Sequence, residues 1–203
     1  MRILIIGATG TIGRAIVATL RARHELVLAS RRNAPEMVDI TDPASIRALY
    51  ARIGRVDAVV SATGQAKYAP LAALTDADFA FSLGNKLMGQ VNVVRYGVDA
   101  VADGGSFTLT SGVLAQQPTP GSAALSLVNA AVEAFARAAA LELPRGIRIN
   151  VVSPPWVSET LRTMGRDPAG GLPAADVARA YVESVEGTKT GAVITPRRGA
   201  ASA

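Results

Sequence analysis

The chain has 203 residues, 49% of them hydrophobic and 18% charged, which is enough apolar material for the core of one compact domain and excludes an intrinsically disordered protein. It has no cysteine, which excludes disulfides and thiolate metal sites, and its single histidine, His24, is expected at the surface, so we expect no bound metal. The net charge of +5 comes mostly from arginines scattered along the chain, and aromatic residues are few, so we expect no nucleic-acid partner.

No apolar run reaches the eighteen or so residues that a membrane span needs. The chain passes from Met1-Arg2 directly into its first apolar run without the features of a signal peptide. We therefore expect a cytoplasmic protein with no membrane partner.

The first predicted element is a strand at Ile3 to Ile6, whose four apolar residues are typical of burial on both faces of a sheet. The sequence G-A-T-G-T-I-G follows at residues 7–13 and leads into helical spacing. Backbone N–H groups at the start of such a helix point outward and favour a phosphate. Gly7 suits the tight turn, Gly10 the approach of a pyrophosphate and Gly13 close packing of helix on strand. The motif predicts a dinucleotide site that includes Gly7, Thr9, Gly10, Thr11 and Ile12.

A helix is expected at residues 11–23 and a second strand at residues 25–30, which ends in Ser30-Arg31-Arg32. In dinucleotide-binding folds, a carboxylate at this position binds both ribose hydroxyls of NAD. Two guanidinium groups instead suit the 2'-phosphate of NADP. The alternative is two solvated loop arginines. Since no acidic residue stands at the strand end, Arg31 and Arg32 favour NADP(H) as the cofactor.

The next segments supply the rest of the expected cofactor site. A short strand ends near Asp39-Ile40, where a side chain and backbone can meet adenine, and Thr41 or Asp42 can cap a helix at residues 43–52. A strand at residues 57–61 leads into Ala62-Thr63-Gly64, whose small residues suit close approach to a ribose. Gly64 can alternatively serve only a turn with positive φ.

One long helix is predicted at residues 76–101, ended by Gly104-Gly105, with Lys86 in its middle. A strand at residues 106–110 then places Ser111-Gly112 at the ligand-binding edge of the sheet. The following helix, residues 123–143, is apolar over most of its circumference and carries one narrow polar stripe of Asn129, Glu133 and Arg137. Such a helix needs burial on two sides, so we expect a homodimer or homotetramer through the helices at 76–101 and 123–143. A fully internal helix in a monomer is the alternative.

A sixth strand is expected at residues 147–153, a flexible flap at 161–173, a helix at 174–186, a last strand at 191–195 and a frayed tail at 199–203. Strands alternate with helices throughout, which is typical of a parallel sheet covered on both faces. We predict an α/β chain, a single doubly wound Rossmann-like domain over residues 1–203, with strand order 3-2-1-4-5-6-7.

The chain resembles the short-chain dehydrogenase/reductase family over nearly its whole length. The resemblance rests on five segments: G-A-T-G-T-I-G at 7–13, S-A-T-G at 61–64, G-G-S-F-T-L-T-S at 104–111, A-V-E-A-F-A-R-A-A-A-L-E-L at 131–143 and G-I-R-I-N-V-V-S-P-P-W-V at 146–157. It implies an oxidoreductase that binds its nicotinamide cofactor through those turns, with Val157 and Thr160 near the carboxamide and phosphates. Thr160 can also lie one residue beyond the family position.

The resemblance also implies a catalytic Asn, Ser, Tyr and Lys, and here the chain departs from the family. Leu125 and Asn129 stand where the family has its Tyr and Lys, and neither can replace the proton donor or the cation. The family serine falls on Gly112 without a gap, or on Ser111 if the turn shifts by one. The helical Asn position is occupied by Lys86, with Asn85 beside it.

Lys86 and Ser111 are therefore the candidate catalytic residues. In one hypothesis the Lys86 ammonium enters the cleft and polarises a carbonyl or acts as a general acid, with Ser111 donating a hydrogen bond. In the other, Lys86 is an ordinary surface lysine. Tyr68 is expected in an ordinary loop, and Arg162 and Arg166 can bind an acidic substrate or be solvated.

These predictions lead to an NADP(H)-dependent oxidoreductase that transfers hydride between nicotinamide and a small carbonyl or alcohol through atypical acid/base residues. The alternative is a cofactor-binding sensor or assembly protein without catalysis, which the missing Tyr and Lys favour.

Overall fold

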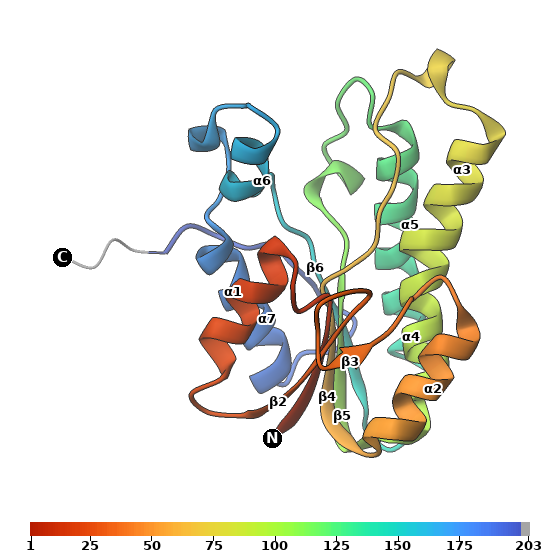
Figure 1. Ribbon diagram of the computed structural model, residues 1–203, viewed down its shortest axis with the longest axis vertical. Coiled ribbons are helices and arrows are strands. Elements are labelled where there is room, and N and C mark those ends of the chain that lie inside the picture. The colour runs from red at the N-terminus through yellow and green to blue at the C-terminus, as the bar shows by residue number, and fades with distance from the viewer. Residues whose placement is uncertain (200–203) are drawn as a thin grey trace.

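The computed structural model describes residues 1–199 and contains one seven-stranded sheet in which all neighbouring strands are parallel (Figure 1). The strand order is β3-β2-β1-β4-β5-β6-β7, which confirms the predicted fold. The strands are β1 (Arg2–Ile6), β2 (Glu25–Ser30), β3 (Glu36–Met37), β4 (Val56–Ser61), β5 (Val101–Thr110), β6 (Arg148–Val152) and β7 (Val193–Ile194).

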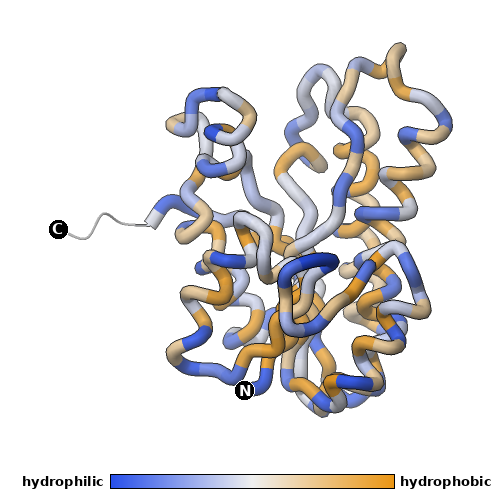
Figure 2. The backbone as a smooth tube through the Cα atoms, viewed as in Figure 1, coloured by the Kyte–Doolittle hydropathy of each residue, from blue (hydrophilic) through white to orange (hydrophobic). Residues whose placement is uncertain are grey.

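Helices cover both faces of the sheet (Figure 1). Helices α1 (Thr11–Leu20) and α7 (Ala174–Glu186) lie side by side on one face, and α2 (Pro43–Ile53), α4 (Gly89–Gly97) and α5 (Ala123–Ala139) lie on the other. The apolar colouring in Figure 2 follows the strands and the inner sides of these helices. Strand β1 shows why: Ile3 and Ile5 belong to one core cluster while Leu4 and Ile6 belong to the other, as expected for a strand buried on both faces.

The predicted helix at residues 76–101 is wrong as a single element. The structure has α3 (Asp76–Ser82), a π-helical segment (Leu83–Met88), α4 and a 3-10 turn (Val98–Ala100). Helix α3 begins where predicted, because Thr75 and Asp78 form a reciprocal capping box. A π-turn changes the direction in which the following side chains point, and this one lies next to the site described below.

Strand β5 also differs from the prediction, since it begins at Val101 and not at Ser106. Gly104 and Gly105 are inside the strand, at an irregularity where the register against β4 shifts. A Cβ on Gly105 would lie 2.5 Å from the Asp57 carbonyl oxygen, so the close approach of the two strands requires glycine there. The glycine pair therefore forms a bulge and does not end a helix.

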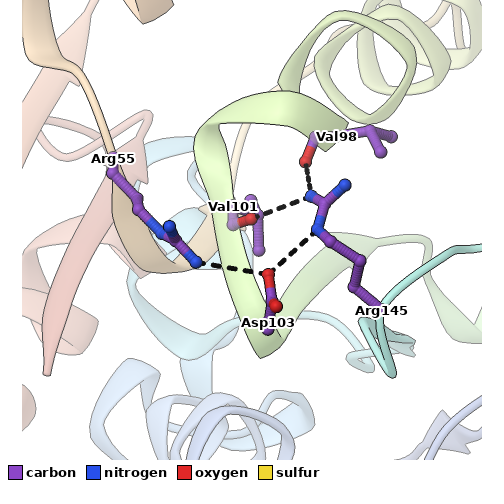
Figure 3. A network of polar contacts seen from close by, with 5 residues as sticks. All are labelled: Arg55, Val98, Val101, Asp103 and Arg145. Atoms are coloured by element: carbon purple, nitrogen blue, oxygen red, sulfur yellow. Dashed lines mark hydrogen bonds and ion pairs between the residues drawn. The ribbon is translucent and has the colours of Figure 1, made fainter.

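The bulge lies at the amino-terminal edge of the sheet and is held by the contacts in Figure 3. Asp103 accepts hydrogen bonds from Arg55 at 3.2 Å and from Arg145 at 3.0 Å. Arg145 also donates to the carbonyl oxygens of Val98 and Val101 at 2.7 and 3.1 Å. These contacts hold together the segment before β4, the start of β5 and the segment before β6, at the end of the sheet opposite the candidate site.

The remaining differences concern the ends of elements. Helix α1 ends at Leu20 and α5 at Ala139, earlier than predicted, and the predicted flap at 161–173 contains the end of α6 (Ser158–Thr163) and a 3-10 turn (Pro168–Gly170). Asp42 is the residue that caps α2. The side chain of His24 is only 10% exposed, which is less than expected, because its ring packs against Glu186 with Nε2 2.8 Å from Oε1.

None of the helices within residues 1–199 is long and apolar enough to cross a bilayer. Most of the predicted tail, residues 200–203, lies outside the described residues.

Candidate active site

A cavity of about 630 Å³ opens at the carboxyl-terminal edge of the sheet. This is the edge where parallel α/β sheets bind ligands, because the loops that leave the strands diverge there. The lining comes from segments that are distant in sequence: the turn after β4, the π-segment, the loop after β5, the first turns of α5 and the loop after β6. It includes Ile12, Ala62, Thr63, Gly64, Lys86, Ser111, Gly112, Leu125, Asn129, Trp156, Val157 and Thr160.

The glycine-rich turn has the shape that a diphosphate site requires. Gly7 has φ +89°, and a Cβ on it would lie 2.5 Å from the Ala62 carbonyl oxygen. Gly10 is the N-cap of α1, and no side chain caps that helix start, whereas Asp42 caps α2 and Thr75 caps α3. An uncapped helix N-terminus beside backbone that only glycine allows is a fitting cradle for an anion. Gly10 and Thr11 are both exposed at this turn.

A second, smaller cavity of about 140 Å³ follows the edge of the sheet from Gly7 toward β2 and β3. The Ser30 and Thr9 hydroxyls are 2.7 Å apart there. The lining includes Gly7, Ser30, Arg31, Asp39, Ile40 and Thr63, while exposed Arg32 lines neither cavity. Thr63 and Gln65 line both cavities, so the two are neighbours along the edge that an extended dinucleotide would follow.

The carboxylate of Asp39 is already engaged in a turn. Its Oδ1 accepts hydrogen bonds from the backbone N–H of Thr41 at 2.9 Å and from the Thr41 hydroxyl at 2.7 Å. These bonds, the side-chain one first, lower the pKa of Asp39. An ionised Asp39 therefore lines the end of the second cavity.

Lys86 is buried, with 8% of its surface exposed, which excludes the alternative of an ordinary surface lysine. It lies on the π-segment, between exposed Gly84 and exposed Met88. Its stem packs against Gly64, where a Cβ would lie 3.0 Å from Lys86 Cγ, and its Nζ donates to the Ser111 carbonyl oxygen at 3.2 Å. Burial lowers the pKa of Lys86 to about 8.

Gln90 fixes the position of the π-segment on the sheet. Its side chain accepts from the Thr110 N–H and donates to the Thr110 carbonyl oxygen, both at 2.8 Å, in the manner of a neighbouring strand. It also donates to the Lys86 carbonyl oxygen at 3.3 Å. One buried amide thus attaches the Lys86 backbone to the end of β5, where Ser111 follows.

Ser111 is bonded to a buried carboxylate that the sequence did not indicate as part of the site. Its Oγ donates to Glu133 Oε1 at 2.7 Å, and Gln116 Nε2 donates to the other oxygen of Glu133. Glu133 is only 3% exposed and is one helical turn after Asn129 on α5. Two residues of the polar stripe, Asn129 and Glu133, therefore face inward, whereas Arg137 is exposed and Leu127 on the same helix is 47% exposed.

Asn129, which the resemblance places at the position of the family lysine, is 1% exposed and lines the main cavity. Its Oδ1 has no hydrogen-bond partner among residues 1–199. A buried acceptor without a partner is costly, and a ligand hydroxyl or N–H in the cavity would satisfy it. A Cβ on Gly112 would lie 3.0 Å from Asn129 Nδ2, so the family serine position also borders this amide.

Aromatic residues form part of the cavity rim. Trp156 lines the cavity, and the ring of Tyr68 meets it edge to face at 6.1 Å between centroids. The Tyr68 hydroxyl contacts Thr119 and Pro120 at 3.1 and 2.9 Å, as expected for a loop residue. Arg166 covers the Trp156 ring at 5.4 Å from its centroid.

Sequence reasoning missed Glu133 and Gln116 as site residues. The sequence identifies Glu133 only as a member of a narrow polar stripe, although its spacing of four from Asn129 places both on one helix face. Gln116 lies in a loop without periodicity, so no sequence pattern indicated its contact.

Comparison with known proteins supports a common family. The family model described as enoyl-(acyl carrier protein) reductase matches residues 8–190. The chain is 32% identical over 128 residues to hydroxynaphthalene reductase arp2 of Aspergillus fumigatus, a match covering 61% of this chain and 47% of that protein. It is 28% identical over 200 residues to the 3-oxoacyl-[acyl-carrier-protein] reductase FabG of Escherichia coli, covering 83% and 79%. In the first three curated relatives the match spans about half their length.

Solved structures are similar over almost the whole chain. The protein lin1944 of Listeria innocua is 44% identical with a TM-score of 0.92, covering 96% of this chain and 98% of that one. A small-chain dehydrogenase solved in complex with NADPH is 26% identical with a TM-score of 0.84, covering 96% and 95%.

Proposed function

Because the chain belongs to the short-chain dehydrogenase/reductase family of oxidoreductases, we propose that it uses NADP(H) to transfer hydride between nicotinamide and a small carbonyl or alcohol, with Lys86 and Ser111 as catalytic residues. The observation that carries this proposal is the buried Lys86, which is hydrogen-bonded to Ser111 and lines the main cavity together with Leu125 and Asn129. A buried amine of lowered pKa in a cleft is typical of a functional group.

The residues proposed to hold the cofactor follow the two cavities. The uncapped start of α1 would bind the diphosphate, the second cavity the adenosine half, and the turn at residues 62–64 the ribose next to the main cavity. The full set is Gly7, Thr9, Gly10, Thr11, Ile12, Arg31, Asp39, Ile40, Ala62, Thr63, Gly64, Val157 and Thr160; Arg32, which lines neither cavity, is not part of it. Arg31, which lines the second cavity beside Ser30, is the main reason to prefer NADP(H) over NAD.

When bound, the nicotinamide supplies or accepts the hydride. In carbonyl reduction, the Lys86 ammonium would polarise the carbonyl oxygen and Ser111 would donate a hydrogen bond to it. Asn129 Oδ1 would accept a hydrogen bond from a hydroxyl bound in the cavity. A pKa of about 8 leaves the Lys86 amine mostly charged at neutral pH and able to release its proton.

The proposal includes a cytoplasmic homodimer or homotetramer. Exposed apolar side chains on the π-segment and on α5, including Leu83, Met88 and Leu127, support a partner surface there. Sedimentation of the wild type and of Leu127→Glu tests it: the variant should sediment as a smaller species, and equal sedimentation would contradict this interface.

The test of function uses the single tryptophan of the chain, Trp156, which lines the cavity. Titration with NADPH or NADH should quench its emission, with the tighter binding for NADPH. A panel of small ketones and aldehydes is then screened for NADPH oxidation. Tight binding without turnover of any substrate would favour the alternative of a cofactor sensor, and failure to bind either dinucleotide would overturn both.

A further inference from the structure

Glu133 is a buried titratable residue for which the proposed chemistry has no role. Both of its oxygens accept hydrogen bonds, one from Ser111 and one from Gln116, and none of the ion pairs within residues 1–199 includes it. A carboxylate without a cationic partner is expensive to bury. A leucine or glutamine at this position would avoid that cost, so a buried acid here suggests a functional role for its carboxyl group.

The Ser111 hydroxyl has one proton, and this sets a condition on the reaction. With Glu133 ionised, that proton points to Glu133 at 2.7 Å and the oxygen of Ser111 can only accept a hydrogen bond from a ligand. With Glu133 protonated, Glu133 donates to Ser111 and the serine proton is free to point into the cavity. The charge of Glu133 therefore decides whether Ser111 faces an alcohol or a carbonyl.

We propose that Glu133 is the proton reservoir behind Ser111 and takes the place of the tyrosine that the family has at residue 125. This rests on the proposed function. In reduction, Ser111 gives its proton to the carbonyl oxygen as hydride from the reduced nicotinamide adds to the carbonyl carbon. Glu133 gives its proton to Ser111 and is left as a carboxylate, the substrate becomes an alcohol, and the dinucleotide is oxidised. Alcohol oxidation follows the same path in reverse.

Two neighbouring residues bear on this proton transfer: Gln116, which contacts Glu133, and Lys86, which contacts Ser111. Gln116, which donates to Glu133 Oε2, is exposed, so one side chain separates the carboxylate from solvent. Two titratable groups contact Ser111: Glu133 through the hydroxyl and Lys86 through the carbonyl oxygen. Lys86 provides positive charge at the substrate, and Glu133 provides the transferred proton. Glu133 is a positioning residue, because it acts through Ser111.

The experiment is a double-mutant cycle of Glu133→Gln and Ser111→Ala, with Glu133→Asp as the conservative variant and exposed Glu142→Gln as the matched control. NADPH affinity is measured through Trp156 emission, the unfolding midpoint by heating, and kcat on a ketone that the wild type reduces. We expect Glu133→Gln to lower kcat by about a hundredfold or more with NADPH affinity unchanged, and Glu133→Asp to restore part of it. The Glu142→Gln variant should match the wild type.

The double variant is the decisive measurement. If Glu133 acts only through Ser111, the double variant loses no more activity than Ser111→Ala alone. Losses that multiply, or a Glu133→Gln variant within threefold of the wild type in kcat, would overturn the relay and leave the proposed function intact. A wild type that binds no NADPH or reduces no carbonyl would instead mark failure of the proposed function.

Discussion

The two ends of β5 carry polar groups in opposite situations. At the amino-terminal end, Asp103 is 67% exposed and is paired with two arginines (Figure 3). Just beyond the carboxyl-terminal end, Ser111 is buried together with Lys86, Glu133 and Asn129. Exposed ion pairs contribute little and cost little, whereas buried polar groups are costly unless every partner is present.

That contrast separates a structural network from a candidate site. At the Asp103 end the carboxylate and both guanidinium groups have hydrogen-bond partners within residues 1–199. At the Ser111 end, the Lys86 amine is charged at neutral pH although burial disfavours the charge. The Asn129 Oδ1 atom has no hydrogen-bond partner within residues 1–199. A fold that keeps such groups at one edge gives up stability there, as active sites do.

The strongest test of this contrast is Lys86→Met. Removing the cation from the cavity should lower carbonyl reduction by about 10²–10⁴-fold, because the charge that polarises the carbonyl is lost. NADPH affinity, measured through Trp156 emission, should change little. Turnover within threefold of the wild type would remove Lys86 from the mechanism.

The same variant should be more stable than the wild type at neutral pH. The pKa of Lys86 falls from 10.5 in the unfolded chain to about 8 in the fold, so below pH 8 the folded state carries the full cost of a buried charge, about 3 kcal/mol. Above pH 10.5 both states are neutral and the cost is gone. Urea unfolding of wild type and Lys86→Met should therefore differ most below pH 8 and converge between pH 8 and 10.5. A difference independent of pH would contradict the burial of a titrating amine.

Arg31→Ala should weaken NADPH binding by about 10- to 100-fold, the effect of losing charge-assisted bonds to a phosphate, and leave NADH binding unchanged. Arg32→Ala is the matched control, since Arg32 lines neither cavity, and its effect should stay below about threefold. Equal losses for NADPH and NADH in Arg31→Ala would show that Arg31 does not read the 2'-phosphate. Fluorescence titration gives all four values.

Turnover in the wild type should respond to pH near 8. Carbonyl reduction should fall as pH rises through about 8, because Lys86 then loses its charge, and Lys86→Met should lack this step. The change is smaller than the loss in the variant, since only the protonated fraction is altered. A wild-type profile without a step between pH 7 and 9 would argue against an essential ammonium.

The smallest effect is expected at the opposite end of the sheet. Asp103→Asn removes the charge between Arg55 and Arg145, and it should lower the free energy of unfolding by no more than about 1 kcal/mol. Turnover and NADPH affinity should stay at wild-type values. A loss of activity would mean that the two edges are coupled through β5.

Much of the fold could be predicted from local patterns. The order of elements, the helix start at Thr75-Asp78 and the burial of β1 on both faces follow from periodicity and capping. The π-segment could not be predicted, because it is held by Gln90, whose side chain bonds to Thr110 at the end of a strand twenty residues away. The early start of β5 could not be predicted either, because it depends on the close approach of Gly105 to β4. Helical spacing through residues 76–101 looks the same with or without that turn.

The sequence by itself determined the parallel sheet, the glycine turn that favours a dinucleotide and the presence of Leu125 and Asn129 where the family resemblance implies a Tyr and a Lys, because these depend on residue type and on neighbours along the chain. Only the tertiary structure decided that Lys86 is buried, that Ser111 bonds to Glu133 and that the Asn129 oxygen has no partner within residues 1–199. Burial and pairing arise when segments distant in sequence meet, and they set the charge and the hydrogen-bonding direction of each group in the cavity.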